Sequence, residues 1–222
     1  MNSAFQPLPV SALATFLISV AINYFLGKDT GKKDPMSIAP PGYFFAIWGV
    51  IYLLFLGLLI FLCFYGRLPD ECFYYLIAIS ALNATWIVFS WSDLSFRLPM
   101  MLVILLALVA SCGALWLSIP RLAFDSDVSY IVAKNIVSFY WGWVTAASVL
   151  NLCLVLKYNF GVGDLGLLRT FWIVAPIWGV IMFVLMAKRG LGEIGYIGFL
   201  LSFGWAIIGV IKSKDKVHAP LY

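Results

Sequence analysis

The sequence predicts an all-α integral membrane protein, folded as a bundle of seven transmembrane helices. Hydrophobic residues make up 64% of the 222 residues and charged residues 11%, whereas about 25% of the residues in a soluble domain are charged. Seven apolar stretches approach the length of about 20 residues that crosses roughly 30 Å of hydrocarbon, and we expect every charged residue to lie in a connector or a tail. The expected spans are Val10–Leu26, Tyr43–Tyr65, Cys72–Ser92, Leu98–Ile119, Val137–Leu156, Thr170–Met186 and Tyr196–Ile211.

The first two spans are bounded by clear sequence signals. No Lys or Arg occurs in the N-terminal segment MNSAFQPLPV. A signal or transit peptide would carry them, so Val10–Leu26 is expected to be a retained first helix. The connector Gly27–Gly42 is rich in Gly, Asp and Pro, which is typical of a turn-rich loop. Its Pro40-Pro41 pair is suited to the first turn of the second helix, where a missing N–H costs nothing.

The later spans are separated by connectors too short to hold a soluble domain. Asp70 and Asp93 flank the third span and are expected to reach water. Asp125-Ser126-Asp127 interrupts the connector between the fourth and fifth spans. Pro176 lies inside the sixth span, and the seventh is followed by a short basic tail. The whole chain is therefore expected to be membrane-embedded.

The 14 Lys and Arg residues are distributed unevenly between the two sides of the predicted bundle. Nine of the 14 lie on the side opposite the N-terminus. Because internal loops carry an excess of positive charge, we expect the N-terminus outside and the C-terminus inside, in the matrix or cytoplasm. A mitochondrial membrane and a bacterial plasma membrane both fit. The nine residues are Lys28, Lys32, Lys33, Arg97, Lys157, Arg169, Lys212, Lys214 and Lys216.

Three spans place aromatic and polar side chains on one helical face. An amide in hydrocarbon must find a partner, so Asn83 and Asn151 are expected to point into the bundle. Aromatic residues beside the small residues Gly142, Ala146 and Ala147 could line a slot for a flat apolar ligand, and plain helix packing is the alternative. The faces consist of Phe45, Trp48 and Tyr52, of Asn83, Trp86 and Ser90, and of Tyr140, Trp143, Ala147, Leu150 and Asn151.

Three segments resemble motifs of the translocator protein, or tryptophan-rich sensory protein, family. Residues Pro40–Tyr52 are similar to the second helix of that family, with a proline pair, an aromatic residue, a Phe, a Trp and then a Tyr. Leu82–Phe89 resembles its Asn-x-x-Trp-x-x-x-Phe element, and Tyr140–Asn151 resembles its Tyr-x-x-Trp-x-x-x-Ala-x-x-Leu-Asn element. The motifs occur in the family's order.

The resemblance implies a five-helix bundle over residues 1–156 that binds tetrapyrroles, sterols or other flat apolar molecules. Residues 157–222 would then form an extension with two further transmembrane helices and a short basic tail. In the family the first connector caps the pocket, and here the charges of Lys28, Lys32 and Lys33 could meet ligand carboxylates. Carried over by motif, the expected ligand-binding residues are Phe45, Trp48, Asn83, Trp86, Trp143, Ala147, Leu150 and Asn151.

Catalysis and metal binding find little support in the sequence. No expected span holds a carboxylate, His or Lys positioned for general acid–base chemistry, and no nucleophile has a base beside it. The cysteines, Cys63, Cys72, Cys112 and Cys153, lack the spacing of a zinc or redox motif. No spacing supports haem ligation. We therefore expect no enzyme activity, no metal site, no required cofactor and no nucleic-acid partner.

Binding or sensing of a flat hydrophobic ligand, among membrane lipids, is the function that the sequence favours. The main alternative is an accessory subunit of a larger membrane complex, for example a mitochondrial respiratory assembly. Such a subunit would have kept the fold but not the ligand site, and its partners would be other membrane subunits or further copies of itself. Departures from the motifs support this alternative, because the usual Pro between Phe45 and Trp48 is missing and Tyr43 replaces a Trp. A transporter is a third hypothesis, for which only Pro176 indicates a broken helix.

Overall fold

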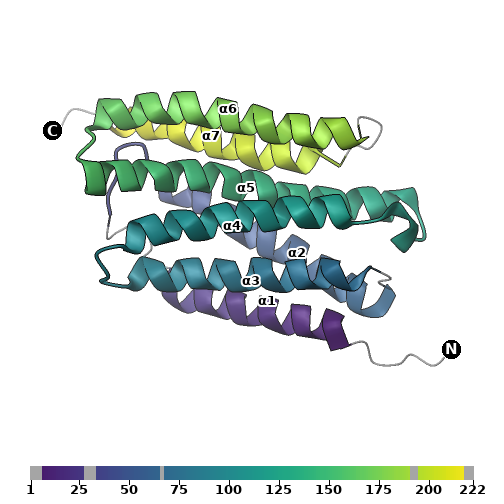
Figure 1. Ribbon diagram of the computed structural model, residues 1–222. Helices are drawn as coiled ribbons and strands as arrows, with labels where there is room; N and C mark the ends of the chain where they lie inside the picture. The colour runs from purple at the N-terminus through teal and green to yellow at the C-terminus, as the bar shows by residue number, and fades with distance from the viewer. Residues whose placement is uncertain (1–6, 28–33, 66–67, 191–194, 218–222) are drawn as a thin grey trace.

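The computed structural model describes residues 7–27, 34–65, 68–190 and 195–217. Within these ranges the chain forms seven α-helices and two short 3-10 helices and no strand, which confirms the all-α fold (Figure 1). The connectors alternate between the two ends of the bundle. The α-helices are α1 Pro7–Leu26, α2 Ile47–Tyr65, α3 Asp70–Trp91, α4 Arg97–Ser118, α5 Asp127–Phe160, α6 Asp164–Gly190 and α7 Ile197–Val217, and the 3-10 helices are η2 Gly42–Ala46 and η3 Arg121–Ala123.

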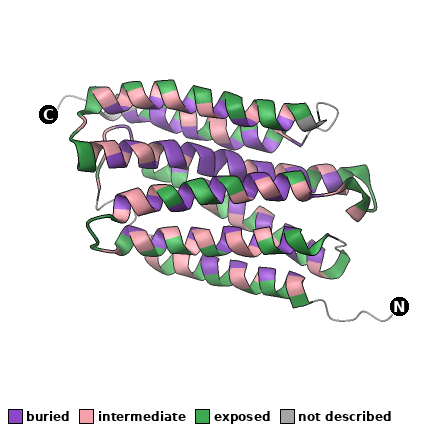
Figure 2. Cartoon of the chain, viewed as in Figure 1, coloured by how far each residue is buried: buried purple, intermediate pink, exposed green. Residues whose placement is uncertain are grey.

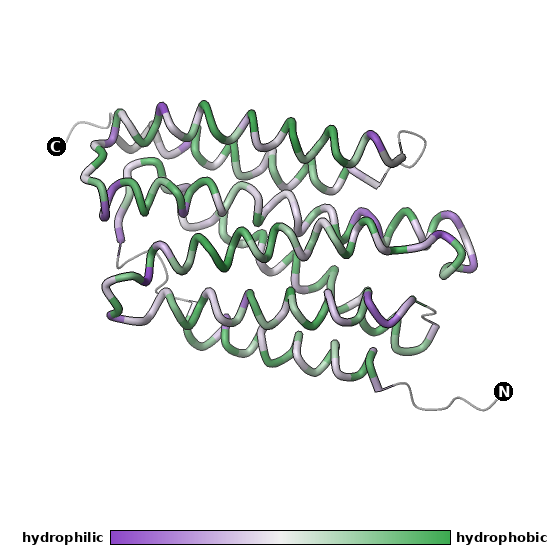
Figure 3. The backbone as a smooth tube through the Cα atoms, in the orientation of Figure 1, coloured by the Kyte–Doolittle hydropathy of each residue, from purple (hydrophilic) through white to green (hydrophobic). Residues whose placement is uncertain are grey.

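Six of the helices in the described ranges are long and apolar enough to cross a membrane. The chain is therefore an integral, multi-pass membrane protein. The expected count of seven spans holds only loosely, because the described apolar part of α7, Ile197–Ser213, is a shorter helix than the other six. Hydrophobic residues dominate the middle of most helices, the middle of α5 is paler, and hydrophilic residues gather near the helix ends (Figure 3).

Helix α5 is longer than the sequence indicated. The Ser126 hydroxyl accepts the N–H of Ser129 at 3.2 Å and caps the helix start. Gly161, with φ of 68°, ends the helix in the left-handed region that favours glycine. These 34 residues span about 51 Å at 1.5 Å per residue, which exceeds the roughly 30 Å hydrocarbon thickness.

The early start of α5 corrects one expectation. Lys134 lies inside this helix rather than in a connector, and its side chain is buried. Its ammonium group donates a hydrogen bond to the Trp116 carbonyl oxygen and lies 4.0 Å from the centroid of the Trp116 ring. The backbone carbonyl and the ring face together stabilise the buried Lys134 ammonium group, which the hydropathy pattern predicted to lie in a water-exposed connector.

Among the six spans, α5 is the most buried (Figure 2). It contacts α2, α4, α6 and α7, while α3 packs between α1 and α4. Helices α6 and α7 form a layer on one side of α5 (Figure 1). The sequence division at residue 156 falls inside α5, so no connector separates the two parts there.

The contact between α5 and α7 is made by small residues in register. Gly142 lies one turn after Ser138 on α5, and Ser202 lies one turn after Gly198 on α7. A Cβ atom at Gly198 would overlap the carbonyl oxygen of Asn135, and one at Gly142 would overlap the Ser202 hydroxyl. Such small-x-x-x-small pairs let two helix backbones approach closely inside a membrane. Gly142 therefore faces α7 and not the expected ligand slot.

Replacing Gly198 by Ala should separate α5 from α7, because the added methyl group meets backbone atoms that cannot move independently. We expect a loss of about 1–3 kcal/mol of stability, the usual cost of overpacking. Circular dichroism, recorded while the protein is heated in detergent, measures this loss. Gly204→Ala is the matched control on α7, since a Cβ at Gly204 meets nothing within 4 Å. Equal melting temperatures for the two variants would contradict the close contact.

Candidate ligand-binding site

One pocket of about 120 Å³ lies between α2, α3 and α5 and beneath the described part of the first connector. Seven of the eight expected ligand-binding residues line it, although they come from three separate helical segments. The residues carried over from the family motifs therefore lie together around one pocket, with the exception of Asn83. The residues that line the pocket are Asp34, Met36, Ala39, Pro40, Phe45, Trp48, Trp86, Ser90, Met101, Trp143, Ala147, Leu150, Asn151 and Leu154.

Three aromatic rings form one wall of the pocket. The ring centroids of Phe45 and Trp143 lie 6.2 Å apart, and those of Trp48 and Trp143 lie 5.9 Å apart. Both pairs cross at 88°, the edge-to-face arrangement that aromatic quadrupoles favour. Trp143 is the centre of this group and is fully enclosed, whereas Phe45 remains 45% exposed. The wall is therefore rigid on the α5 side and open on the η2 side.

Polar side-chain atoms that have no partner among the described residues also lie around the pocket. The indole N–H groups of Trp86 and Trp143 and the amide oxygen of Asn151 are buried and have no hydrogen-bond partner among the described residues. Such groups destabilise a folded protein unless something satisfies them. Two donors and one acceptor around one apolar pocket match a ligand that carries a few polar atoms on an apolar body.

The structure does not bring Asn83 to this pocket. Its amide nitrogen donates to the Ser19 hydroxyl at 3.3 Å and to the Tyr52 hydroxyl at 3.4 Å. These contacts join α3 to α1 and α2, the interhelical role that amides have in membranes. Asn83 lines only a void of about 10 Å³, roughly the room of a single water molecule.

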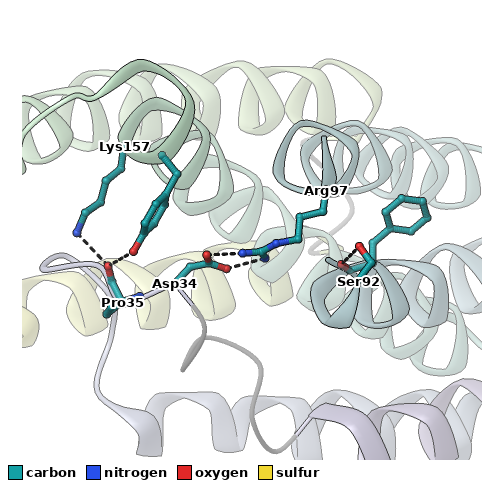
Figure 4. A network of polar contacts seen from close by, with 7 residues as sticks. Asp34, Pro35, Ser92, Arg97 and Lys157 are labelled. Atoms are coloured by element: carbon teal, nitrogen blue, oxygen red, sulfur yellow. Dashed lines mark hydrogen bonds and ion pairs between the residues drawn. The ribbon is translucent and has the colours of Figure 1, made fainter. Parts of the chain in front are cut away.

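The first connector is held at Asp34 and Pro35 by residues of α4 and α5 (Figure 4). Arg97 at the start of α4 holds the Asp34 carboxylate through both guanidinium nitrogens, one of them at 2.7 Å. On the other side, the Lys157 ammonium and the Tyr158 hydroxyl donate to the Pro35 carbonyl oxygen at 2.9 and 2.8 Å. The Asp34 and Arg97 side chains are only 12% and 13% exposed, so water competes weakly for this pair. Lys28, Lys32 and Lys33 lie outside the described residues.

Helix α7 supports the pocket from behind. The Trp205 indole N–H donates to the Phe44 carbonyl oxygen at 3.1 Å, and the two rings lie 4.7 Å apart. Gly209 leaves room for Pro40 and Phe44, since a Cβ there would come within 3.0 Å of the Pro40 side chain. The segment that enters α2 is thus held between α7 and the pocket.

Ser90, Met101 and Leu154 line the pocket but were not among the expected ligand-binding residues. Ser90 had been placed on the Trp86 face of the third span, and Leu154 follows Leu150 by one helical turn, so periodicity could have added both. Met101 carries no sequence signal, because α4 shows no polar or aromatic face toward the pocket. Among the described residues, no group of three His, Cys, Asp or Glu side chains is placed to hold a metal ion.

One family model matches most of the chain. The model described as TSPO-like protein matches residues 8–221 of the chain. The match includes α6 and α7 as well as the helices that form the pocket. No curated protein and no solved structure matches the chain.

Replacing Arg97 by Gln should loosen the connector over the pocket, because the Asp34 carboxylate loses its charged partner. We expect amide exchange at residues 36–39 to become at least about tenfold faster, since a charge-assisted hydrogen bond contributes roughly 1.5–3 kcal/mol. Hydrogen–deuterium exchange with mass spectrometry measures this rate.

Arg121→Gln is the matched control, because it removes an Arg–Asp pair whose side chains are 60% and 65% exposed. Exposed pairs contribute little to stability, so exchange at residues 36–39 should stay at the wild-type rate. Unchanged exchange in Arg97→Gln would show that Asp34 does not fasten the connector.

Proposed function

Because the chain belongs to the TSPO-like protein family, we propose that it is a membrane-embedded binding or sensing protein for a flat hydrophobic ligand of tetrapyrrole or sterol type. The observation that carries this proposal is the convergence of seven motif residues from three helical segments on one pocket. Trp86, Trp143 and Asn151 supply polar atoms there that have no partner in the described part of the chain, and the rest of their surroundings is largely apolar. This combination suits a mostly apolar ligand whose orientation is set by a few polar atoms.

The volume of the pocket adds a mechanistic step to the proposal. At about 120 Å³ the pocket is smaller than the roughly 300–1,000 Å³ that ligand sites usually enclose. The connector residues Asp34, Met36 and Pro40 form part of its wall. We infer that a flat ligand binds when this connector shifts, which requires the ion pair between Asp34 and Arg97 to open.

We also propose that binding occurs without catalysis. Asp34 is the one ionisable side chain among the residues that line the pocket, and Arg97 neutralises it. Both Asp34 carboxylate oxygens accept hydrogen bonds from the Arg97 guanidinium, so neither is free to take a proton from a ligand. We therefore propose that the site needs no cofactor, and that a tetrapyrrole or sterol would be bound there as a ligand.

Filling the pocket should abolish binding. Ala147 lines the pocket, and in Ala147→Phe the phenyl group would occupy space that the ligand needs. We expect the Kd for protoporphyrin, measured by quenching of tryptophan fluorescence in nanodiscs, to rise at least about tenfold, or roughly 1.4 kcal/mol. Ala81→Phe on the exposed face of α3 is the control, and its Kd should match the wild type. Equal Kd values for all three proteins would contradict the proposed site.

A second candidate function is that of an accessory subunit in a larger membrane complex. The small pocket and the edge-to-face contacts of Trp143 favour it, because both features are those of a packed interior. Extraction from native membranes in a gentle detergent, followed by native separation and mass spectrometry, distinguishes the two functions. Migration only with a large complex at fixed stoichiometry would support the subunit, while a monomer or dimer that binds protoporphyrin would exclude it.

A further inference from the structure

A second cavity, larger than the ligand pocket, lies away from it. It is a cleft of about 610 Å³ over α5, between α4 and α6, and we call it the α4–α6 cleft. Helices α4 and α6 each pack on α5 and not substantially on each other, which leaves the space between them. The cleft is lined by Leu106, Val109, Ala110, Gly113, Ala114, Trp116, Leu117, Trp141, Trp178, Met182, Leu185 and Met186.

The chemistry of the cleft excludes a charged or strongly polar occupant. Its lining contains no charged, hydroxyl or amide side chain. On the rims, Leu106, Leu117 and Leu185 are 41%, 43% and 49% exposed. Exposed leucines on spanning helices face hydrocarbon, so the cleft opens sideways into the bilayer. An occupant therefore reaches it from the lipid phase.

The length of the cleft matches one leaflet. From Leu106 to Leu117 the lining covers 12 residues of α4, and the 11 steps between them rise about 16 Å at 1.5 Å per residue. This distance is close to half of the roughly 30 Å hydrocarbon core. The cleft ends just before Pro120 and Arg121, and the Arg121 side chain is exposed and pairs with Asp127. Its outer end thus lies at the membrane surface, and its inner end near the midplane.

We propose that the α4–α6 cleft binds one acyl chain of a membrane phospholipid from the leaflet next to Arg121. Ala110 and Ala114 keep the α4 wall low enough to admit a chain. Met182 and Met186 form the opposite wall, and their flexible thioethers adapt to an irregular partner. Apart from the indole N–H groups of its tryptophans, the lining offers no polar side-chain group, which suits a chain of methylene groups. This site is separate from the proposed ligand pocket and does not depend on it.

A bulky residue in the cleft should displace the chain. Ala110 and Ala107 are both exposed alanines on α4, but only Ala110 lines the cleft. The protein is purified in mild detergent after reconstitution into phosphatidylcholine vesicles, and native mass spectrometry counts retained lipids. We expect wild type and Ala107→Phe to retain one phospholipid, and Ala110→Phe to retain it at an occupancy at least tenfold lower. Ala114→Phe should lose the retained phospholipid to the same extent, and it replaces Ala110→Phe in the test if that variant fails to fold.

A second readout reports contact directly. In vesicles of phosphatidylcholine with bromine atoms on the chains, tryptophan quenching should fall in Ala110→Phe and stay at the wild-type level in Ala107→Phe. Equal lipid occupancy and equal quenching in both variants would overturn the proposal.

Two other occupants would also overturn it. One is a quinone retained from native membranes, whose carbonyl oxygens could accept from the indole N–H groups of Trp141 and Trp178, which have no partner among the described residues. The other is a second copy of the chain, shown by a dimer that Ala110→Phe dissociates and Ala107→Phe does not.

Discussion

Close packing around α5 is the constraint on which the rest of this structure depends. Hydrocarbon gives helices no hydrophobic reason to associate, so van der Waals contact between well-matched surfaces must hold the bundle together. On α5, small residues such as Ser138 and Gly142 bring α7 close, and α2, α4 and α6 occupy the remaining directions. The position of every other helix except α1 and α3 is set by contact with α5 itself.

Three consecutive residues on α5 show how one helix organises several sites. Trp141 lines the α4–α6 cleft, Gly142 lies against α7, and Trp143 lines the ligand pocket. Because successive residues on a helix point about 100° apart, three neighbours in sequence face three different parts of the bundle. The pocket and the cleft therefore share a rigid wall, while their other walls belong to different helices.

The two openings differ in what closes them. A polar connector fastened by Asp34, Arg97 and Lys157 covers the ligand pocket at the membrane surface, where ionised groups retain some hydration (Figure 4). The α4–α6 cleft has no such cover among the described residues and opens along hydrocarbon. Helix α7 contributes to the first site through Trp205, which supports the segment that leads into α2. The C-terminal helices are thus part of the support of the pocket, consistent with a family match that includes them.

The sequence by itself determined the helices and most of the pocket. The length of an apolar stretch predicts a membrane span, and the 3.6-residue period predicts which residues share a helical face. Both properties are local, so the faces of Trp48, Trp86 and Trp143 could be predicted without knowing which helices pack against them. Only the tertiary structure decided which neighbour each face meets. It turned Asn83 toward Ser19 and Tyr52, buried Lys134 against Trp116, and left a cleft beside Trp141. Partners of this kind lie far apart in the chain, and periodicity within one helix carries no information about them.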